Sequence, residues 1–594
     1  MCGLIGIFSP STDSRPQSVI NIKTAFDLLC HRGPDRQKII KVPNGYIGFN
    51  RLEIVGGSNA MQPIISEDGN VCLVCNGEIY NHEDLKKTLK KRHAFKTKSD
   101  CEVILHLYEE LGENIFSLLK GQFSVIIYDW NKKIALAGRD RFGINPLFYS
   151  VSEGKIVFAS EIKAILSLSE SVPRLNIQGL YQVFTLYGVT PPYSIFQNVY
   201  QVPPASFVSF DFQTHKLESK QYWRFPDAKA KKVTMSLADQ IGKLDVLLKQ
   251  SVKRRLQGAG IPGFYLSGGL DSSTIAWYLT ALSEIKPFGF GIQFKNEAFN
   301  EAVYQNLVID MLKTPFFTVT GDGTEIYKYL YKTIWHTESP LSRLAPIPMY
   351  ILSKRVNEKG LKYILCGEGA DEILAGYPIF SEGISSIESK RELTQVVNIF
   401  SHEVKKTILH EKQGFACRIR ENNRKLSRLM QSQIIEIETK LSRYLLACQG
   451  DRVSMANSVE QRFPFLDEDL VDFILSQPDA FKMYNMQGKY GLKKLMVTRL
   501  PRQIIDRKKR GYLSPDMLML PNSETKQGKE LYSLLSDKMI RHTGYFDKRI
   551  VKNLTNKFFH HTLNAFEQSA FLFALTTQIF HVLFVDKDLS RLKW

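Results

Sequence analysis

The feature that most restricts the fold of this chain is a glycine- and serine-rich loop between an apolar strand and a helix. We expect the strand at 263–266 and the helix at 273–282, and further buried strands at 288–294 and 362–366. Strands that alternate with helices pair in parallel, because each helix returns the chain to the same edge of the sheet. The sequence therefore predicts a parallel α/β sheet, followed by mostly helical structure from about residue 384.

The N-terminal part has a different pattern, in which short apolar runs are separated by Gly, Asn and Asp turn signals. These runs predict strands at 46–50, 71–75, 123–130, 134–137 and 155–159, with helices at 83–91 and 101–111. Because 594 residues exceed what one hydrophobic core usually supports, we expect two domains, with boundaries at 2–210 and 233–594.

The glycine-rich loop is suited to binding a phosphate. It reads Leu266-Ser267-Gly268-Gly269-Leu270-Asp271-Ser272-Ser273, and its small residues let backbone N–H groups and hydroxyls surround an anion at a helix N-terminus. A second loop at a strand end reads Cys366-Gly367-Glu368-Gly369-Ala370-Asp371-Glu372. The two loops are expected to meet, because open α/β sheets bind ligands at the carboxyl ends of their strands. Asp271 and Asp371 then become candidate ligands of Mg²⁺, with helix capping as the alternative.

Cys2 is the candidate nucleophile of the N-terminal part. Removal of the initiator methionine would leave a thiol and a free α-amine on one residue, which is a nucleophile together with its base. His31-Arg32-Gly33-Pro34-Asp35, Arg51-Leu52, Asn76-Gly77-Glu78-Ile79-Tyr80-Asn81, Ser99-Asp100 and Arg139-Asp140-Arg141-Phe142-Gly143 follow in order. Together these motifs resemble the class II glutamine amidotransferases.

That resemblance implies an N-terminal-nucleophile fold, a sandwich of two sheets between helices. An Asn side chain and a Gly N–H can stabilise the oxyanion that forms on the substrate amide, so Asn76 and Gly77 are assigned that role. Arg51 is expected to bind the α-carboxylate of glutamine, and Glu78 and Asp100 its α-ammonium group.

The second half resembles the ATP pyrophosphatase-type synthetase domain of the asparagine synthetase family, through its SGGxDS-like loop, its Cys366–Glu372 loop and the run 451–467. The resemblance implies ATP bound by Leu266, Ser267, Gly268, Gly269, Asp271, Ser272, Ile292, Cys366 and Gly367. It also implies that Lys489 stabilises an acyl-adenylate, with Glu368 as a partner of this lysine or of ammonia. A homodimer is compatible with the resemblance.

The acceptor of the ammonia is left open by the sequence. Aspartate is favoured by the family, but residues 336–348 lack the threonine-rich text of well-known asparagine synthetases. Arg343 in this stretch could bind an acidic substrate or have a structural role. The alternative is an amidotransferase that acts on another carboxylate, such as a secondary-metabolite or cell-surface sugar-acid precursor. An idle scaffold that retains the fold is a third reading.

The charge and the apolar runs argue against two other classes of protein. The formal net charge is +18, with basic clusters at 86–98, 405–425 and 507–510. These clusters lack the interleaved aromatics of a nucleic-acid groove, so we expect a solvated surface and no nucleic acid. The run 570–585 is too short and polar to span a membrane and predicts a buried helix. Eight cysteines without a disulfide pattern, and no secretory signal, predict a cytosolic protein.

Overall fold

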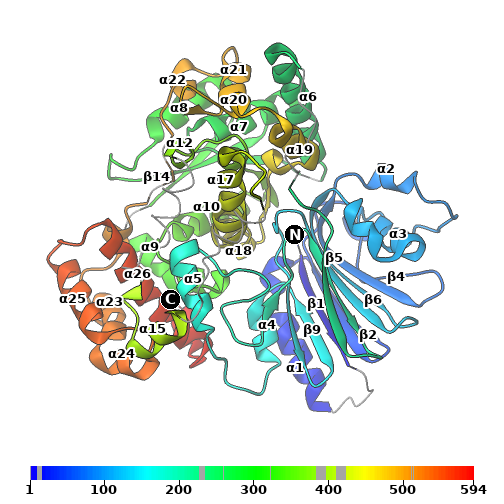
Figure 1. The fold of residues 1–594 in the computed structure, drawn as a ribbon, viewed down its shortest axis with the longest axis horizontal. Helices are drawn as coiled ribbons and strands as arrows, with labels where there is room; N and C mark the ends of the chain where they lie inside the picture. The colour runs from blue at the N-terminus through cyan, green and yellow to red at the C-terminus, as the bar shows by residue number, and fades with distance from the viewer. Residues whose placement is uncertain are drawn as a thin grey trace.

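The computed structural model describes residues 2–9, 16–225, 235–258, 260–321, 323–382, 397–409, 423–509, 511–512 and 514–593. The N-terminal part contains two six-stranded antiparallel sheets (Figure 1), ordered β10-β8-β9-β1-β3-β2 and β12-β11-β7-β6-β5-β4. The first sheet consists of β1 (Gly3–Phe8), β2 (Arg36–Val42), β3 (Gly45–Arg51), β8 (Phe148–Ser152), β9 (Lys155–Ala159) and β10 (Tyr200–Gln201). The second consists of β4 (Ile64–Ile65), β5 (Val71–Ile79), β6 (Gly121–Asp129), β7 (Ile134–Arg139), β11 (Ser206–Asp211) and β12 (Lys216–Gln221).

Alternation of side chains along the strands explains why these sheets pack face to face. In β5, Cys72 and Val74 lie in the core between the sheets, whereas Leu73 and Cys75 pack on the other face, against α3 (Glu102–Leu111). Helices α1 (Pro16–Asp27) and α4 (Ile162–Ser167) contribute to the core outside the first sheet. The predicted sandwich of two sheets between helices is confirmed.

One predicted helix is shorter than expected. The helix predicted at 83–91 is α2 (His82–Lys86), and within it only Leu85 is buried. A helix with a single buried side chain gains little from packing, and short helices are marginal without it. The chain beyond Lys86 instead runs through turns toward α3.

The predicted parallel sheet is confirmed, and its strand order identifies a ligand-binding edge. The order is β15-β14-β13-β16-β17, with every pair parallel. The strands are β13 (Gly263–Tyr265), β14 (Phe288–Gln293), β15 (Phe316–Thr320), β16 (Tyr363–Leu365) and β17 (Glu460–Arg462). The chain adds strands on one side of β13 and then, from β16, on the other side. Their carboxyl ends therefore flank a topological switch point, where such sheets bind ligands.

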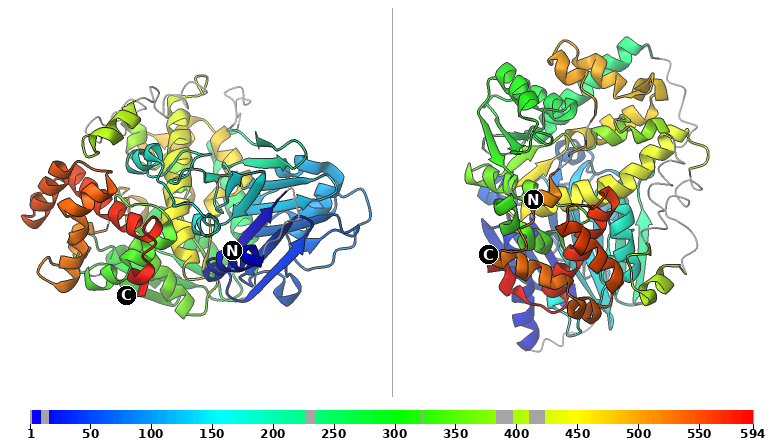
Figure 2. Two further views of the ribbon diagram at one scale, coloured as in Figure 1. Left: turned by 90° about the horizontal axis from the view of Figure 1, so that it is seen from below. Right: turned by 90° about the vertical axis from the view of Figure 1, so that its left-hand side faces the viewer.

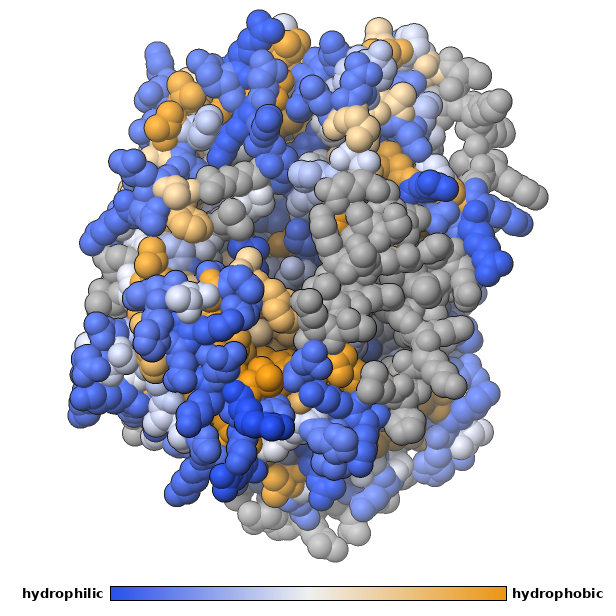
Figure 3. Space-filling view, turned by 60° about the vertical axis from the view of Figure 1, so that its left-hand side comes forward, coloured by the Kyte–Doolittle hydropathy of each residue, from blue (hydrophilic) through white to orange (hydrophobic). Residues whose placement is uncertain are grey.

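The rest of the described chain is mainly helical, as predicted. Helices α24 (Asp537–Thr543), α25 (Lys548–Phe559) and α26 (Ala565–Phe584) gather at the end of the molecule away from the two antiparallel sheets (Figures 1 and 2). The predicted buried helix at 570–585 is α26, which begins with a capping box between Asn564 and Glu567. Among the residues that the structure describes, no helix is long and apolar enough to cross a membrane. On the face in Figure 3, hydrophilic side chains predominate.

Helix α19 (Glu468–Ser476) joins the helical part to the second antiparallel sheet. The Glu468 carboxylate accepts the N–H of Gly121 at 2.8 Å, and Lys120 Nζ lies 2.5 Å from Asp469 Oδ1. Burial, followed by the charge of Asp467, raises the pKa of Glu468 to about 7. The contact between the two parts therefore contains a carboxyl group that holds its proton near neutrality.

A Glu468→Gln variant is expected to gain stability relative to the parent protein as the pH rises from about 4.3 to 7. The unfolded chain loses the Glu468 proton near pH 4.3, whereas the folded protein keeps it up to about pH 7, so the parent loses stability across this window. Glutamine keeps the acceptor for Gly121 and does not titrate. Thermal unfolding of both proteins at pH 5 and pH 8 should show a difference that grows by an amount on the order of 1 kcal/mol. A difference that is equal at both pH values would contradict the assigned proton.

Candidate active sites

Cys2 directly precedes β1 and is held at three of its atoms. Its backbone N–H donates to Asn76 Oδ1 at 2.5 Å, its Sγ accepts the N–H of Leu52 at 3.5 Å, and its carbonyl accepts Nε of Arg32 at 3.1 Å. Burial raises the pKa of the thiol to about 11, although the Leu52 N–H opposes this shift. The thiol is therefore uncharged at neutral pH and needs a base to become a nucleophile.

The Asn76-Gly77 pair beside Cys2 is fixed by the sheet. Gly77 has φ +134°, and a Cβ at this position would lie 1.9 Å from the carbonyl oxygen of Gln122, so only glycine fits. The Asn145 amide donates to the carbonyl of Asn76 at 2.6 Å. This contact holds the Asn76-Gly77 peptide next to the thiol.

A small cavity brings the predicted glutamine-binding residues together with Cys2. Arg51, Gly77, Glu78 and Asp100 all line it. Arg51 is oriented by the carbonyl of Val55, 3.0 Å from its Nη2, and Asp100 accepts the N–H of Ile79 at 2.6 Å. Burial, followed by the charge of Asp100, raises the pKa of Glu78 well above its ordinary value, and burial also raises that of Asp100. The cavity thus brings a guanidinium and two carboxyl groups to one place beside Cys2.

Residues from the second half of the chain complete this cavity, which the sequence did not predict. Glu460 of β17 lines the cavity beside Cys2. Arg462 lies 2.6 Å from Glu460 Oε1 through Nε and 3.1 Å from Glu78 Oε1 through Nη2. Arg32, which binds the Cys2 carbonyl, also pairs with Asp451 at 2.8 Å. The position of the thiol therefore depends on both halves of the protein.

A larger cavity of about 780 Å³ opens at the switch point of the parallel sheet. Helix α7 (Leu270–Leu282) begins there, with Gly269 at its N-cap. The predicted residues that line the cavity are Leu266, Ser267, Gly269, Asp271, Ser272, Ile292, Gly367, Glu368, Asp371 and Lys489. The structure therefore brings both strand-end loops and the distant lysine into one site.

Two predicted residues support this cavity without lining it. Gly268 has φ +74°, and a Cβ there would lie 2.6 Å from Cβ of Tyr304, so the turn requires glycine. Its carbonyl accepts Nη1 of Arg507 at 3.1 Å. Cys366 is fully buried, and its thiol faces the carbonyl of Ile364. Neither Gly268 nor Cys366 is among the residues that line the cavity.

Two carboxylates and two lysines form the charged centre of the larger cavity. Lys489 Nζ lies 2.6 Å from Asp271 Oδ2 and 2.6 Å from Asp371 Oδ1. Lys509 Nζ lies 2.5 Å from Asp371 Oδ2 and 3.4 Å from Asp271 Oδ2. Burial alone would raise the pKa of Asp371, but the two lysines lower it to about 2. Burial raises the pKa of Glu368, whose Oε2 has no hydrogen-bond partner among the described residues.

Lys509 and Arg507 were not predicted as site residues, because the basic run 507–510 was interpreted as solvated surface. That interpretation is wrong for these two side chains, which line the cavity. Arg507 pairs with Glu301 and lies 3.9 Å from the ring centre of Tyr304. Neither residue follows a strand or a glycine-rich turn, so no local signal marked them.

A cavity built around a buried cysteine and another built around a glycine-serine loop with paired carboxylates define a glutamine-dependent amidotransferase that uses ATP. The family model described as asparagine synthase matches residues 243–581, and the one described as glutamine amidotransferase domain matches residues 1–223. The chain belongs to the asparagine synthase family.

The relatives of this chain are not all named for the same activity. The chain is 30% identical to asparagine synthetase [glutamine-hydrolyzing] 2 of Bacillus subtilis, over 84% of this chain and 70% of that one. It is 26% identical to amidase chyE of Penicillium rubens, over 84% of this chain and 85% of the relative. Among solved structures, a glutamine phosphoribosylpyrophosphate amidotransferase from B. subtilis aligns with 53% of this chain and 65% of that chain, at 15% identity and a TM-score of 0.28.

Proposed function

We propose that this protein converts L-aspartate, L-glutamine and ATP into L-asparagine, L-glutamate, AMP and diphosphate. The proposal is carried by the pairing of a cysteine cavity with a phosphate-loop cavity in one chain. The first suits the release of ammonia from an amide, and the second suits the activation of a carboxylate by a nucleotide. We place the glutaminase in residues 2–210 and the synthetase in residues 233–594, and β12 (Lys216–Gln221) also pairs with a sheet of the first unit.

In the glutaminase, the Cys2 sulfur attacks the side-chain amide carbon of glutamine. A carbon–sulfur bond forms, the carbon–nitrogen bond breaks, and ammonia leaves with the thiol proton; water then hydrolyses the thioester to glutamate. The α-amine of Cys2, freed by removal of Met1, serves as the base that the buried thiol needs. Asn76 and Gly77 stabilise the oxyanion. Arg51, Glu78 and Asp100 bind the two charged ends of the substrate.

In the synthetase, the acceptor carboxylate attacks the α-phosphate of ATP and diphosphate leaves, giving an acyl-adenylate. Ser267, Gly269 and Ser272 surround the phosphates at the start of α7. Ammonia then attacks the acyl carbon, AMP leaves, and the positive charge of Lys489 offsets the charge that develops there. Both reactions in one chain limit the loss of ammonia to protonation in bulk water.

Asp271 and Asp371 fit a bound Mg²⁺. Their carboxylates converge within reach of the same two lysines, and Asp271 Oδ1 is buried with no hydrogen-bond partner in the described part of the chain. Oxygen donors shared with phosphate are the usual environment of this ion. When bound, Mg²⁺ would neutralise part of the charge on the phosphates.

The residues on the acceptor side of the cavity favour a carboxylic acid as the substrate, and more than one such acid is a candidate. Arg343 lines the cavity, and its Nη2 donates to the carbonyl of Tyr512 at 3.2 Å, which fixes the guanidinium near the site. A fixed guanidinium favours an acidic substrate with a second carboxylate that does not react, as aspartate has. The amidase name among the relatives favours the second candidate, an amidotransferase for another carboxylic acid.

A screen of carboxylic acids with ATP, Mg²⁺ and glutamine tests the acceptor. We expect aspartate to give asparagine, with one diphosphate and one AMP for each product, measured by product mass and diphosphate release. An Arg343→Met variant should raise the KM for aspartate by roughly tenfold or more, because it removes the guanidinium that binds the acid. Amidation of another acid while aspartate gives no product would replace aspartate with that acid. No amidation of any acid would refute the proposal.

A further inference from the structure

Two histidines and four glutamates meet where segment 87–101 folds back against helix α3. His93 belongs to that segment and His106 to the helix. The glutamates that surround them are Glu67, Glu102, Glu109 and Glu110. The histidine side chains are 8% and 2% exposed, so the cluster is built into the fold. It lies outside both cavities described above.

The two ring nitrogens of His93 face different glutamates. Its Nε2 lies 3.1 Å from Glu110 Oε1, while its Nδ1 lies 3.6 Å from Glu109 Oε2 and 3.9 Å from Glu67 Oε1. A carboxylate that accepts the N–H of one ring nitrogen leaves the lone pair on the other, as it does behind metal-binding histidines. One ring nitrogen of each histidine and one oxygen of Glu67 lie within 4.8 Å of one another.

His106 adds a buried ring nitrogen that lacks a close hydrogen bond among the described residues and lies 3.8 Å from Glu102 Oε1. Its Nδ1 lies 2.9 Å from Glu109 Oε2, but its Nε2 has no hydrogen bond in the part of the chain that the structure describes. A buried nitrogen without a hydrogen bond is costly unless a ligand or proton engages the ring. Glu102 and Glu109 are the carboxylates nearest to the two ring nitrogens of His106, so negative charge surrounds the ring.

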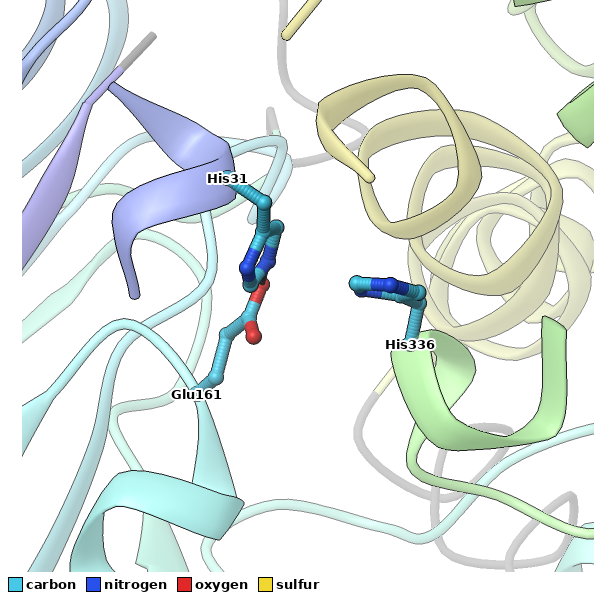
Figure 4. A group of neighbouring side chains, drawn as sticks. All are labelled: His31, Glu161 and His336. Atoms are coloured by element: carbon cyan, nitrogen blue, oxygen red, sulfur yellow. Dashed lines mark hydrogen bonds and ion pairs between the residues drawn. The ribbon is translucent and has the colours of Figure 1, made fainter. Parts of the chain in front are cut away.

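A second histidine cluster differs from the one around His93 in the charge of its neighbours. In Figure 4, His31 and Glu161 point toward one another, and His336 faces them from helix α9 (Gly323–Thr337). Glu161 Oε1 already binds Arg32 at 2.9 Å, and its Oε2 pairs with Lys163. A metal ion bound at Glu161 would be repelled by the positive charges of Arg32 and Lys163. Around His93, no lysine or arginine side chain pairs with the four glutamates within the described ranges.

We propose that His93, His106 and Glu67, with Glu109 beside them, bind a divalent transition-metal ion of the zinc class. Imidazole and carboxylate donors suit zinc, cobalt and nickel, and a closing movement of the exposed Glu67 side chain brings the donors to the usual 2.0–2.2 Å or so from the ion. The ion fastens segment 87–101 to α3. The same segment contains Asp100, which lines the cavity beside Cys2.

Titration of the metal-stripped full-length protein with Zn²⁺ tests the site, by calorimetry and by thermal unfolding. We expect one Zn²⁺ per chain that is lost in His93→Ala and in Glu67→Gln, with a rise in the thermal midpoint that these variants do not show. Glu110→Gln should bind Zn²⁺ about 10–100-fold more weakly, because it alters the carboxylate behind His93 while glutamine can still accept the N–H groups of Lys90 and Lys91. Co²⁺ bound there should lack a thiolate charge-transfer band, which excludes the cysteines.

Two control variants at other histidines test whether the loss of Zn²⁺ is specific to the cluster around His93. His402→Ala removes an exposed histidine, and His336→Ala alters the cluster of Figure 4; both should retain the Zn²⁺. Because the Glu67 side chain is 43% exposed, Glu67→Gln should leave the metal-free thermal midpoint within a few degrees of the parent, which keeps its loss of Zn²⁺ interpretable. The proposal is overturned if the parent protein binds no Zn²⁺ at 100-fold excess, or if the bound Zn²⁺ persists in His93→Ala and Glu67→Gln.

Discussion

Replacing Cys2 by alanine is expected to lower glutamine-dependent product formation by roughly 10³-fold or more, since no thioester can form without the sulfur. The same variant should keep its activity with added ammonium salt within about twofold. The reason is the separation of the two cavities, which share no lining residue. Alanine is also small enough to leave the Asn76 contact of the backbone N–H in place.

Glutamate release and amidated product should be measured in parallel, with glutamine and with ammonium as nitrogen sources. Cys30→Ala is the matched control, because Cys30 is half-buried and lies in neither cavity. Glutamate release by Cys2→Ala at the parent rate would refute the assigned nucleophile. Loss of the ammonium-dependent reaction as well would refute the division into two sites.

Replacing Lys489 by glutamine is expected to lower synthesis by about 10²–10³-fold with either nitrogen source, because its charge faces the place where the acyl-adenylate forms. The structure supports this position, since Nζ lies 2.6 Å from both Asp271 and Asp371. Removal of the lysine leaves Lys509 as the ion-pair partner of these carboxylates among the described residues. Glutamate release, measured without ATP, should be unchanged.

The control for this variant is Lys494→Gln, which removes an exposed lysine from helix α21 (Tyr490–Met496), whose N-cap is Lys489. Diphosphate release and AMP formation should be followed for both variants. A Lys489→Gln protein that keeps more than a tenth of the parent rate with ammonium would remove this lysine from the proposed mechanism. A thermal midpoint close to that of the parent establishes that the loss is not one of folding.

The parts of the sites that the sequence predicted are those with local signals. The Ser267–Ser272 loop follows an apolar strand, Asp371 follows another, and Gly77 sits in a short polar motif, so each could be assigned to a strand end or turn. Periodicity likewise predicted the parallel sheet and a strand-rich N-terminal part, because buried strands and amphipathic helices differ in pattern. The sandwich was implied by the resemblance of the motifs to the class II glutamine amidotransferases.

The parts that the sequence did not predict depend on contacts between distant residues. Arg462 reaches Glu78 across 384 positions of sequence, and Glu460 lines a cavity of the other half of the chain. Lys509 lies in a basic run that resembles an ordinary charged surface, and only the packing of the fold turns it toward Asp371. Helix α2 ended early for the same reason, since its packing, not its composition, sets its length.

The Arg32 bridge between the Cys2 carbonyl and Asp451 has a consequence for protein synthesis. Asp451 lies 419 positions after Arg32, and Glu460 and Arg462 follow later still. A chain that is still growing on the ribosome therefore has its nucleophile near the start but lacks the residues that hold it and enclose its cavity. The glutaminase cavity is complete only when residues through Arg462 have been translated and folded, so we expect a nascent chain without them to hydrolyse glutamine more slowly than the finished protein.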